Sequence, residues 1–401
     1  MFVPQSSKES KKLIKFEGPS TSTKQFNFKD LLSKQPSMDD QLHAFYRHTS
    51  IPEPVTRLQH FIYSLIEDVV AALFPLAQYR LFGSSVNGFG RIGSDVDAVL
   101  DLTASSKSPS PSPFLFMTKP RTANHQQIFL EWLGDTLRRF VPYVVDVTTI
   151  RHARVPIVKF RHVVGGFSGD ICLNNLSAVY MAKLLWTFSQ LDPRVAPIYF
   201  FIRQYARAIS LTRDTPSQAF TNFHLLTLFI FYLQQNCILP SIKKLRELAK
   251  EDDHCSIDGC DCSIVSDLNT IPRSNNSATM SELLLGFLKY YVDFPFKKQG
   301  LSLQTGQDYA KPDYSPVHVD NPFERMHNIT KNVSFQELEK LREYFQTAIW
   351  QLESDSKSNL VNLLFPDAKS QERGLPLDSG FSVKALFDAA DSKKAVKFST
   401  K

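Results

Sequence analysis

Apolar residues recur every three or four positions over long stretches of the chain, which is the spacing of a helix with one buried face. The first stretch opens near Pro54 and is stopped by Pro75. Its apolar positions are Leu58, Ile62, Leu65, Val69 and Leu73. The same spacing predicts further helices over residues 124–140, 177–190, 194–213, 221–235, 240–250, 279–292 and 334–352. The last of these opens with Ser334 and Glu337 at the spacing of a capping box.

Five shorter stretches have the character of strands, and one of them, 95–102, alternates between polar and apolar residues as a strand with one buried face does. They cover residues 77–82, 95–102, 143–150, 155–160 and 167–173. All of them precede residue 177, and the chain after it has a helical pattern. We therefore expect an α/β plus α fold, in which a small sheet domain is followed by a larger helical domain.

The predicted domain boundaries follow these changes in pattern. They are a disordered tail over 1–35, a helical segment over 36–75 that packs on the helical domain, a sheet domain over 76–176, a helical domain over 177–365 and a variable tail over 366–401. The Ser- and Pro-rich stretch 103–113 is expected to be an exposed connection.

Composition is that of an ordinary globular protein, with 43% apolar and 21% charged residues. The net charge of +6 permits an anionic partner without requiring one. The longest apolar run covers 225–233, which is too short to cross a bilayer. We therefore expect no membrane partner.

The chain has five cysteines, an odd number, and no signal-peptide pattern, which indicates a reducing compartment. Cys255, Cys260 and Cys262 follow His254 and suggest zinc, but a matching second pair is missing, so a thiol-bearing surface loop is favoured. Residues 1–35 are rich in Lys and Ser yet contain no Arg, which is atypical of a transit peptide. They are either a plain tail or the start of a chain whose targeting segment is missing.

The stretch 81–102, LFGSSVNGFGRIGSDVDAVLDL, contains glycines 88, 90 and 93 at a spacing that also occurs over phosphates. A dinucleotide-binding fold requires a helix to open at the third glycine, but a strand pattern follows. A protein kinase requires Val where Asp95 stands, and its other signature elements do not occur in the chain. The glycines are therefore expected to shape a tight connection.

The carboxylates of the same stretch support a stronger hypothesis. Asp95 and Asp97 are two residues apart and so share a face of the predicted strand, about 7 Å apart. Adjacent anions repel unless a cation lies between them, and their oxygens suit Mg²⁺. The competing interpretation is a solvent-exposed strand edge. Asp101 also shares this face, but it lies further along the strand and is expected to be structural.

Two further features favour the catalytic interpretation. Asp170 stands in a later strand, and Gly83 and Ser84 form a turn whose N–H groups and hydroxyl could hold a triphosphate. Three carboxylates on neighbouring strands beside such a turn are the components of a two-metal site for phosphoryl transfer.

These residues resemble the catalytic signature of the DNA polymerase β-like nucleotidyltransferases. Further stretches match in order, namely ARVPIVKF, GDICLNN, LDPRVAPIYFFIRQYARAISL and NPFERMHNITKNVS. Together they span about residues 40–365 and resemble the mitochondrial poly(A) polymerases in particular. The resemblance implies a palm-like mixed-sheet domain followed by a helical poly(A)-polymerase-associated domain.

It also implies an enzyme that adds AMP from ATP to RNA 3′ ends without a template and releases pyrophosphate. Asp95 and Asp97 would hold both of two Mg²⁺ or Mn²⁺ ions, and Asp170 would complete the site that activates the RNA 3′-hydroxyl. The implied partners are nucleoside triphosphate and RNA 3′ ends, among them mitochondrial mRNA, with a homodimer as a further expectation. The implied location is the mitochondrion, with the cytoplasm as the alternative.

The resemblance assigns the nucleotide pocket as well. Gly83 and Ser84 would hold the triphosphate together with Arg203 and Arg207, and Asn175 would contact the ribose. Phe223 matches the position of an aromatic residue that stacks on the base, although by periodicity alone it is a core residue. Without the resemblance, the favoured interpretation of the two arginines is a basic helix face exposed to solvent.

His327, followed by Asn328, stands where uridylyl-adding relatives often have a histidine that helps to reject adenine. It leaves a terminal uridylyltransferase as the alternative activity, and an exposed loop histidine as the alternative interpretation. A second alternative is a non-catalytic RNA-binding scaffold. Mitochondrial relatives also carry an RNA-binding-like domain before the catalytic domain, which we expect to be absent or truncated here.

Overall fold

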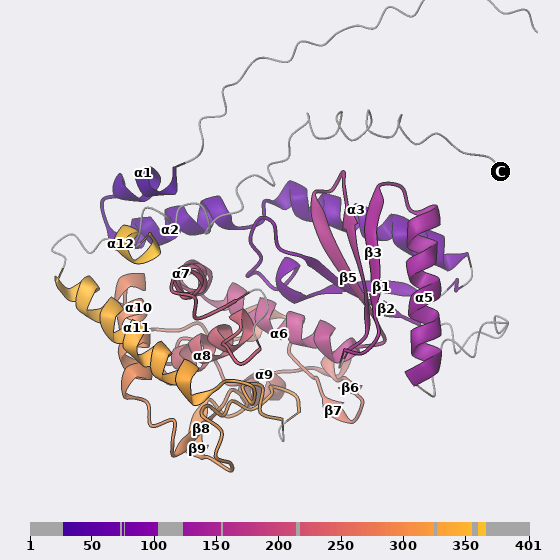
Figure 1. Cartoon of the computed structure of the whole chain (residues 1–401). Helices are drawn as coiled ribbons and strands as arrows, with labels where there is room; N and C mark the ends of the chain where they lie inside the picture. Colours follow the sequence, from indigo (N-terminus) through magenta and orange to yellow (C-terminus); the bar gives the residue numbers. More distant parts are fainter. Residues whose placement is uncertain are drawn as a thin grey trace, which may run out of the picture.

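The computed structural model describes residues 27–72, 74–75, 77–102, 123–153, 155–213, 217–324, 327–354 and 360–365. Figure 1 shows a sheet flanked by helices beside a larger group of helices. The predicted α/β plus α fold is therefore confirmed. The connection predicted over 103–113 and the tail predicted over 366–401 lie outside the described residues.

Five strands form a mixed sheet in the order β1-β2-β5-β4-β3. They are β1 (Gln78–Phe82), β2 (Val96–Asp101), β3 (Val144–Ile150), β4 (Ile157–His162) and β5 (Phe167–Leu173). β2 and β5 run parallel, and the other neighbouring strands are antiparallel. Each of the five corresponds to one stretch that the sequence predicted as a strand.

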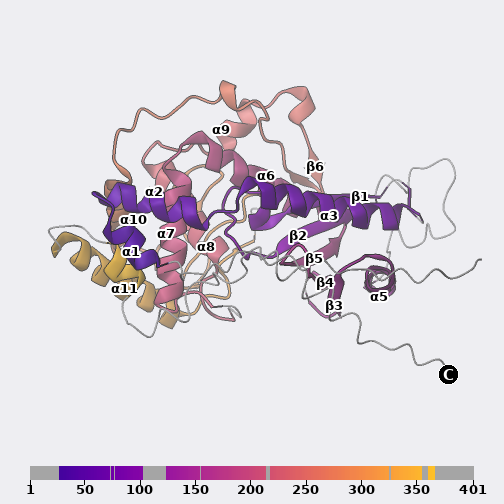
Figure 2. The same ribbon diagram turned by 90° about the horizontal axis from the view of Figure 1, so that it is seen from above.

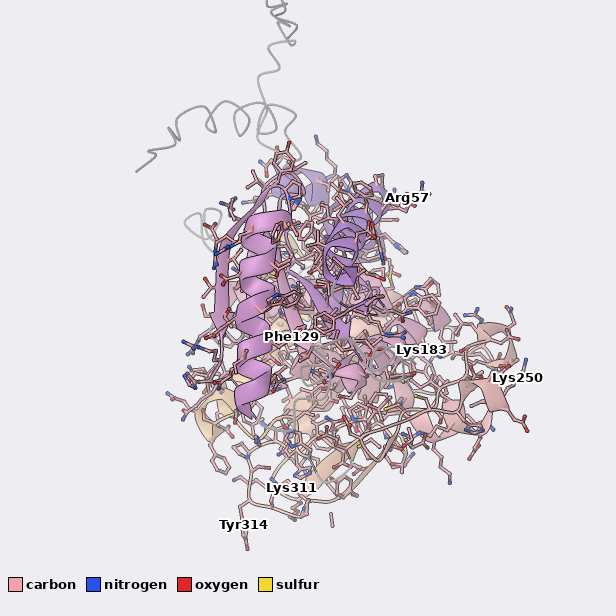
Figure 3. The ribbon with its side chains drawn as sticks, turned by 90° about the vertical axis from the view of Figure 1, so that its right-hand side faces the viewer. Arg57, Phe129, Lys183, Lys250, Lys311 and Tyr314 are labelled. Carbon is pink, nitrogen blue, oxygen red and sulfur yellow. The ribbon has the colours of Figure 1, made fainter. Side chains whose placement is uncertain are left out.

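One face of the sheet packs against α3 (Glu53–Ala71) and α5 (Ala123–Phe140), as Figures 1 and 3 show. Phe129 of α5 is fully buried, and its ring meets that of Phe74 edge-on at 5.5 Å. The strand residues in this core occupy every second position and include Val96, Ala98, Leu100, Val158, Phe160 and Ile171. The intervening residues consequently point to the opposite face.

The helical part has its own, larger hydrophobic core. Its long helices are α2 (Met38–Thr49), α6 (Leu176–Leu191), α7 (Val195–Ala208), α8 (Asn222–Gln235), α10 (Met280–Asp293) and α11 (Phe335–Ser354). Its short helices are α1 (Phe28–Ser33), α9 (Ile242–Glu247) and α12 (Val361–Leu364). No described helix is both long enough and apolar enough to cross a membrane.

Small hairpins and single turns complete the described chain. The hairpins are β6 (Ser256–Ile257) with β7 (Cys260–Asp261), and β8 (Gln299–Ser302) with β9 (Gln307–Ala310). The single turns of 3-10 helix are η1 (Gly83–Ser85), η3 (Glu251–Asp253) and η4 (Leu268–Thr270).

Two boundaries predicted near the N-terminus are wrong. Residues 28–33, predicted as tail, form α1, because Asn27 caps the helix and Phe28 and Leu32 are buried in the helical core. The segment predicted over 36–75 divides, since α2 packs on α7 whereas α3 covers the sheet, and Figure 2 shows the two helices over different parts. Periodicity gives the buried stripe of a helix but does not identify the surface that covers it.

The capping box predicted for α11 forms only in half. The Glu337 N–H donates to the Ser334 hydroxyl at 3.3 Å, as predicted. The Glu337 carboxylate instead accepts from Arg213 at 3.0 Å and from Lys340 at 2.9 Å. A cation from a distant part of the chain therefore takes the carboxylate that local sequence assigned to the cap.

Candidate active site

The face of the sheet that points away from α3 and α5 carries a row of charged side chains. Asp97 on β2 is the register partner of Asp170 on the parallel strand β5, and Asp170 is the partner of Lys159 on β4. Register partners project to the same face of a sheet. The structure thus brings Asp97 together with Asp170, the carboxylate that was predicted on a neighbouring strand.

Asp95 directly precedes β2 and joins this row through Lys159. The Lys159 Nζ lies 3.2 Å from Oδ2 of Asp95 and 3.1 Å from Oδ1 of Asp170. Burial lowers the pKa of Lys159, but its hydrogen bond to Asp170 and the charges of both carboxylates outweigh this effect and raise it. Sequence reasoning missed Lys159, although antiparallel pairing of VPIVKF with FSGDICL would have placed it opposite Asp170.

Within this row, the Asp97 carboxyl has the most strongly raised pKa. Burial raises the pKa of the Asp97 carboxyl to about 7, and the charges of Asp170 and Asp95 act in the same direction. Burial also raises the pKa of Asp170, against the effect of Lys159. The site thus holds more negative charge than its own cation neutralises, which is the condition under which a further cation binds. By contrast, Asp101 pairs with Arg80 at 3.1 Å and is structural, as expected.

The Gly83–Ser84 turn closes over the carboxylates. Gly83 begins the turn after β1 with a φ of +72°, and a Cβ at this position would collide with the Asp97 carboxylate. Only glycine combines this conformation with so close an approach. Gly83 thus lies against Asp97, and the role of Gly83 and Ser84 in holding a triphosphate stays a prediction.

A pocket of about 430 Å³ lies beside Asp95 and is strongly basic. Its arginines are Arg91, Arg203, Arg207 and Arg213. Arg203 and Arg207 extend from the same side of α7, as their spacing of four predicts. Sequence reasoning selected these two and missed Arg91. We call this site the arginine pocket.

Two other predicted residues stand at the beginnings of helices. Asn175 directly precedes α6, and its Oδ1 accepts a hydrogen bond from the Ser177 hydroxyl at 3.1 Å. Phe223 lies in the first turn of α8, next to Thr221 and Asn222 of the arginine pocket, and is partly buried against the helical core. Its position suits both interpretations, and base stacking stays a prediction.

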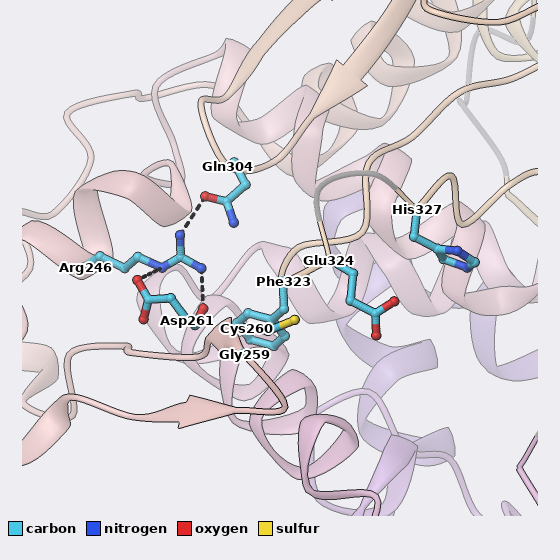
Figure 4. Close-up of a pocket in the computed structure, with 8 residues that line it drawn as sticks. All are labelled: Arg246, Gly259, Cys260, Asp261, Gln304, Phe323, Glu324 and His327. Atoms are coloured by element: carbon cyan, nitrogen blue, oxygen red, sulfur yellow. Dashed lines mark hydrogen bonds and ion pairs between the residues drawn. The ribbon is translucent and has the colours of Figure 1, made fainter.

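His327 lies in a different place. It lines a pocket of about 590 Å³ between the β6–β7 hairpin and residues 323–324, shown in Figure 4, and this pocket shares no lining residue with the arginine pocket. Arg246 is held there by the Asp261 carbonyl at 2.5 Å and by Gln304 at 2.8 Å. A role for His327 in base choice stays a prediction.

Asn328 is buried and engaged within its own loop. Its Oδ1 accepts from the N–H groups of Val319 and Thr330 and from the Thr330 hydroxyl, and its Nδ2 donates to the Val317 carbonyl at 3.0 Å. This network gives Asn328 a structural role in fixing the loop that carries His327. It leaves the predicted direct contact between Asn328 and a nucleotide without support.

No three His, Cys, Asp or Glu side chains of the described residues stand close enough together to hold a metal ion as they are. Cys255 and Cys260 are partly buried and Cys262 is buried, all as free thiols, so the predicted thiol-bearing loop is less exposed than expected. At the carboxylates, the Lys159 ammonium lies between Asp95 and Asp170. The donor set still suits a hard divalent cation, because it consists of carboxylate oxygens, and burial together with the charges of Asp170 and Asp95 disfavours the ionised form of Asp97 as long as no cation is bound.

The sequence matches a family model described as poly(A) RNA polymerase, mitochondrial-like, central palm domain, over residues 38–190. It is 37% identical to the mitochondrial poly(A) RNA polymerase of Mus musculus over 85% of this chain and 60% of that protein. It is also 37% identical to the Homo sapiens enzyme of the same name, over 86% of this chain and 62% of that protein. The chain thus spans about three fifths of the length of these relatives.

Comparison with solved structures also finds similarity to mitochondrial poly(A) polymerase, abbreviated mtPAP. The chain superposes on mtPAP in complex with ATPγS with a TM-score of 0.78 and 35% identity, covering 84% of this chain and 74% of that chain. A complex of mtPAP with UTP gives a TM-score of 0.79 at 35% identity, with the same coverage. The Cid1 poly(U) polymerase is 20% identical with a TM-score of 0.68, which shows a shared fold alone.

Proposed function

Because the chain belongs to the family of mitochondrial poly(A) RNA polymerase-like proteins, we propose that it is an RNA 3′-terminal nucleotidyltransferase that adds AMP from ATP. One observation carries the proposal. Asp97 and Asp170 are register partners on a single face of the sheet, Asp95 is linked to them through Lys159, and the Gly83 turn touches Asp97. This arrangement suits the transfer of a nucleotidyl group.

Each polar group has a task in this reaction. Asp95, Asp97 and Asp170 would hold Mg²⁺ or Mn²⁺, which when bound neutralises phosphate charge and makes the RNA 3′-hydroxyl a better nucleophile. Occupation of the site requires the Lys159 ammonium to withdraw from between Asp95 and Asp170. The N–H groups of the Gly83–Ser84 turn would donate to phosphate oxygens.

The arginine pocket receives the triphosphate in this proposal. Arg203 and Arg207 would bind its oxygens, and the pyrophosphate would leave from there after the RNA 3′-oxygen attacks the α-phosphorus. Phe223, at the edge of the pocket, would stack on the base, and Asn175 would contact the ribose. The names of the relatives, and their complexes with triphosphates, support nucleotide and RNA as substrates and the mitochondrion as the location. Mitochondrial mRNA as the specific RNA, and a homodimer, belong to the same proposal.

Extension of a labelled RNA oligonucleotide with each nucleoside triphosphate alone tests the proposal. ATP with Mg²⁺ or Mn²⁺ should lengthen the RNA, and Asp97→Asn should reduce extension to background. Asp146→Asn is the matched control, because Asp146 is an exposed aspartate of the same sheet that pairs with Arg161 and not with Lys159. Unchanged RNA with all four triphosphates would instead support a non-catalytic scaffold.

The same assay separates adenylyl from uridylyl transfer. If ATP is the preferred substrate, His327→Leu should leave the order of preference among the triphosphates intact. A strong preference of the unaltered protein for UTP, shifted toward ATP by His327→Leu, would replace AMP addition by terminal uridylyl transfer.

A further inference from the structure

Arg91 lies in the glycine-containing connection between η1 and β2, and this connection is firmly held. The Ile92 N–H donates to the Thr49 carbonyl at 2.9 Å, and the Ile51 N–H donates to the Gly90 carbonyl at 3.2 Å. A Cβ at Gly90 would collide with the Ser84 carbonyl. The connection is therefore fixed both to the end of α2 and to the Gly83–Ser84 turn, and Arg91 is presented from a rigid base.

The side chain of Arg91 crosses from the sheet domain to α7. Its Nη1 donates to Oε1 of Gln204 at 3.0 Å, and Gln204 is buried. The guanidinium of Arg203 likewise donates to the Phe89 carbonyl at 3.2 Å. Both of these partners are neutral, and no carboxylate of the described residues forms an ion pair with Arg91 or Arg203.

Three guanidinium groups, those of Arg91, Arg203 and Arg207, thus gather at one wall of the arginine pocket. Burial, followed by the charges of Arg203 and Arg207, lowers the pKa of Arg91 to about 10. Arg213 differs from Arg91, because it lies 3.0 Å from Glu337. Arg91 and Arg203 are partly buried, whereas Arg207 is exposed, and like charges brought together at such a site are costly unless an anion binds between them.

We propose that Arg91 is a third arginine ligand of the triphosphate, which it grips from the sheet domain while Arg203 and Arg207 grip it from α7. The inference rests on the proposed function and extends it to a residue outside the carboxylate row. Asp95 lines the same pocket, so an anion held by Arg91 lies directly beside the catalytic-type carboxylates. A pocket of about 430 Å³ suits a compact polyanion, whereas an RNA backbone requires an open groove.

This role accounts for the glycine spacing noticed in the sequence. Of the three glycines, Gly93 lines the arginine pocket, whereas Gly88 and Gly90 do not. Together the glycines shape a connection that places the Arg91 side chain against α7, and the phosphate contact passes to that side chain.

Equilibrium binding without RNA tests the inference, using ATPγS, inorganic pyrophosphate and AMP as probes. Arg91→Gln should weaken binding of ATPγS and pyrophosphate about 10–100-fold, as expected for a lost charged hydrogen bond, and should leave AMP binding within about threefold. Arg91→Lys should lose less, because it keeps the charge. Arg138→Gln is the matched control, because Arg138 is an exposed arginine of α5 that pairs with Asp135 and does not line the arginine pocket, so its loss should stay below about threefold.

Equal losses for AMP and ATPγS, or no loss for either, would overturn the inference. So would a normal affinity for ATPγS together with a raised KM for RNA, since that result assigns Arg91 to the RNA backbone. If the Arg91→Gln variant does not fold, Arg91→Lys is used for the test. An Arg91→Lys variant that binds pyrophosphate normally but no longer binds AMP would also overturn the inference. Failure of the unaltered protein to bind any triphosphate would reject the proposed function itself.

Discussion

As long as no cation is bound, ionisation of the Asp97 carboxyl lowers the free energy of unfolding of the protein. Its pKa of about 7 in the fold lies above the ordinary value of 3.8 that it regains on unfolding. Below pH 3.8 the carboxyl is protonated in both states and has no effect. Between that pH and about 7 the unfolded chain loses its proton first, so stability falls as the pH rises, and above about 7 the penalty is constant.

Asp97→Asn should therefore stabilise the protein while it removes activity. We expect a gain of about 4 kcal/mol in the free energy of unfolding at about pH 8, shrinking progressively toward about pH 5. Chemical denaturation with a chelator present, at both pH values, measures it. If the Asp97→Asn variant is no more stable than the unaltered protein at the higher pH, the carboxylate is not under strain.

At the scale of residues, sequence periodicity could find side chains that occur in a pattern but not isolated ones. Asp95 and Asp97 are recognisable by their spacing, and Asp170 by its place in a later strand. Lys159 and Arg91 are single cations in ordinary surroundings, and their importance arises only when distant strands and helices come together. His327 is a different case. Its position in the sequence suggested a role in base choice, but in the structure it lines a pocket that is separate from the arginine pocket.

At the scale of elements, the start of α8 holds one wall of the arginine pocket. The Thr221 hydroxyl accepts from the His224 N–H at 3.2 Å, and Nδ1 of His224 accepts from the Thr221 N–H at 3.2 Å. Burial lowers the pKa of His224 to about 4, so at neutral pH its ring is uncharged and Nδ1 can accept a hydrogen bond. This reciprocal cap fixes the first turn, in which Phe223 lies.

Thr221→Ala should cost about 1 kcal/mol in the free energy of unfolding, because an N-cap hydrogen bond is lost. Thr221→Ser keeps the hydroxyl and should cost a fraction of this amount. Urea denaturation of the three proteins compares them. Identical losses for the two variants would mean that the methyl group of Thr221, and not its cap, is what matters.

The helices and strands themselves could be predicted well, since each has a clear period of its own. What α3 covers could not, because its apolar stripe fits a sheet face as well as a helical bundle. The same limit applies to α11, where the capping carboxylate of Glu337 turned to Arg213 instead. Local pattern fixes an element, and competition among distant surfaces decides its partners.

At the scale of the whole molecule, α12 joins the last described residues to the helical core. Leu360, Val361, Leu363 and Leu364 are buried there, and the Leu360 N–H donates to Oε1 of Gln41 at 2.9 Å. α12 packs on α1 and on α7, the helix that carries Arg203 and Arg207. Through α12, the last described residues thus support the helix that carries two arginines of the arginine pocket.

Leu363→Ala should destabilise the protein by about 2–5 kcal/mol, because it opens a cavity in this core. Asn362→Ala is the matched control, since Asn362 is the exposed neighbour on the same helix. Thermal unfolding distinguishes the two, and the half-life of activity at raised temperature should follow it. A tolerance of Leu363→Ala equal to that of Asn362→Ala would show that α12 is not part of the cooperative unit.

The parallel pairing of β2 with β5 determines when the candidate active site can form during synthesis and folding. Asp97 meets Asp170 only after the helix and two strands between them have been made and folded into place. Contacts so remote along the chain form late, and a slip of one residue would turn one of the two carboxylates to the wrong side. A chain that is still being synthesised, or whose strands are misaligned, therefore lacks the paired carboxylates. The candidate active site forms only when the sheet is complete and in register.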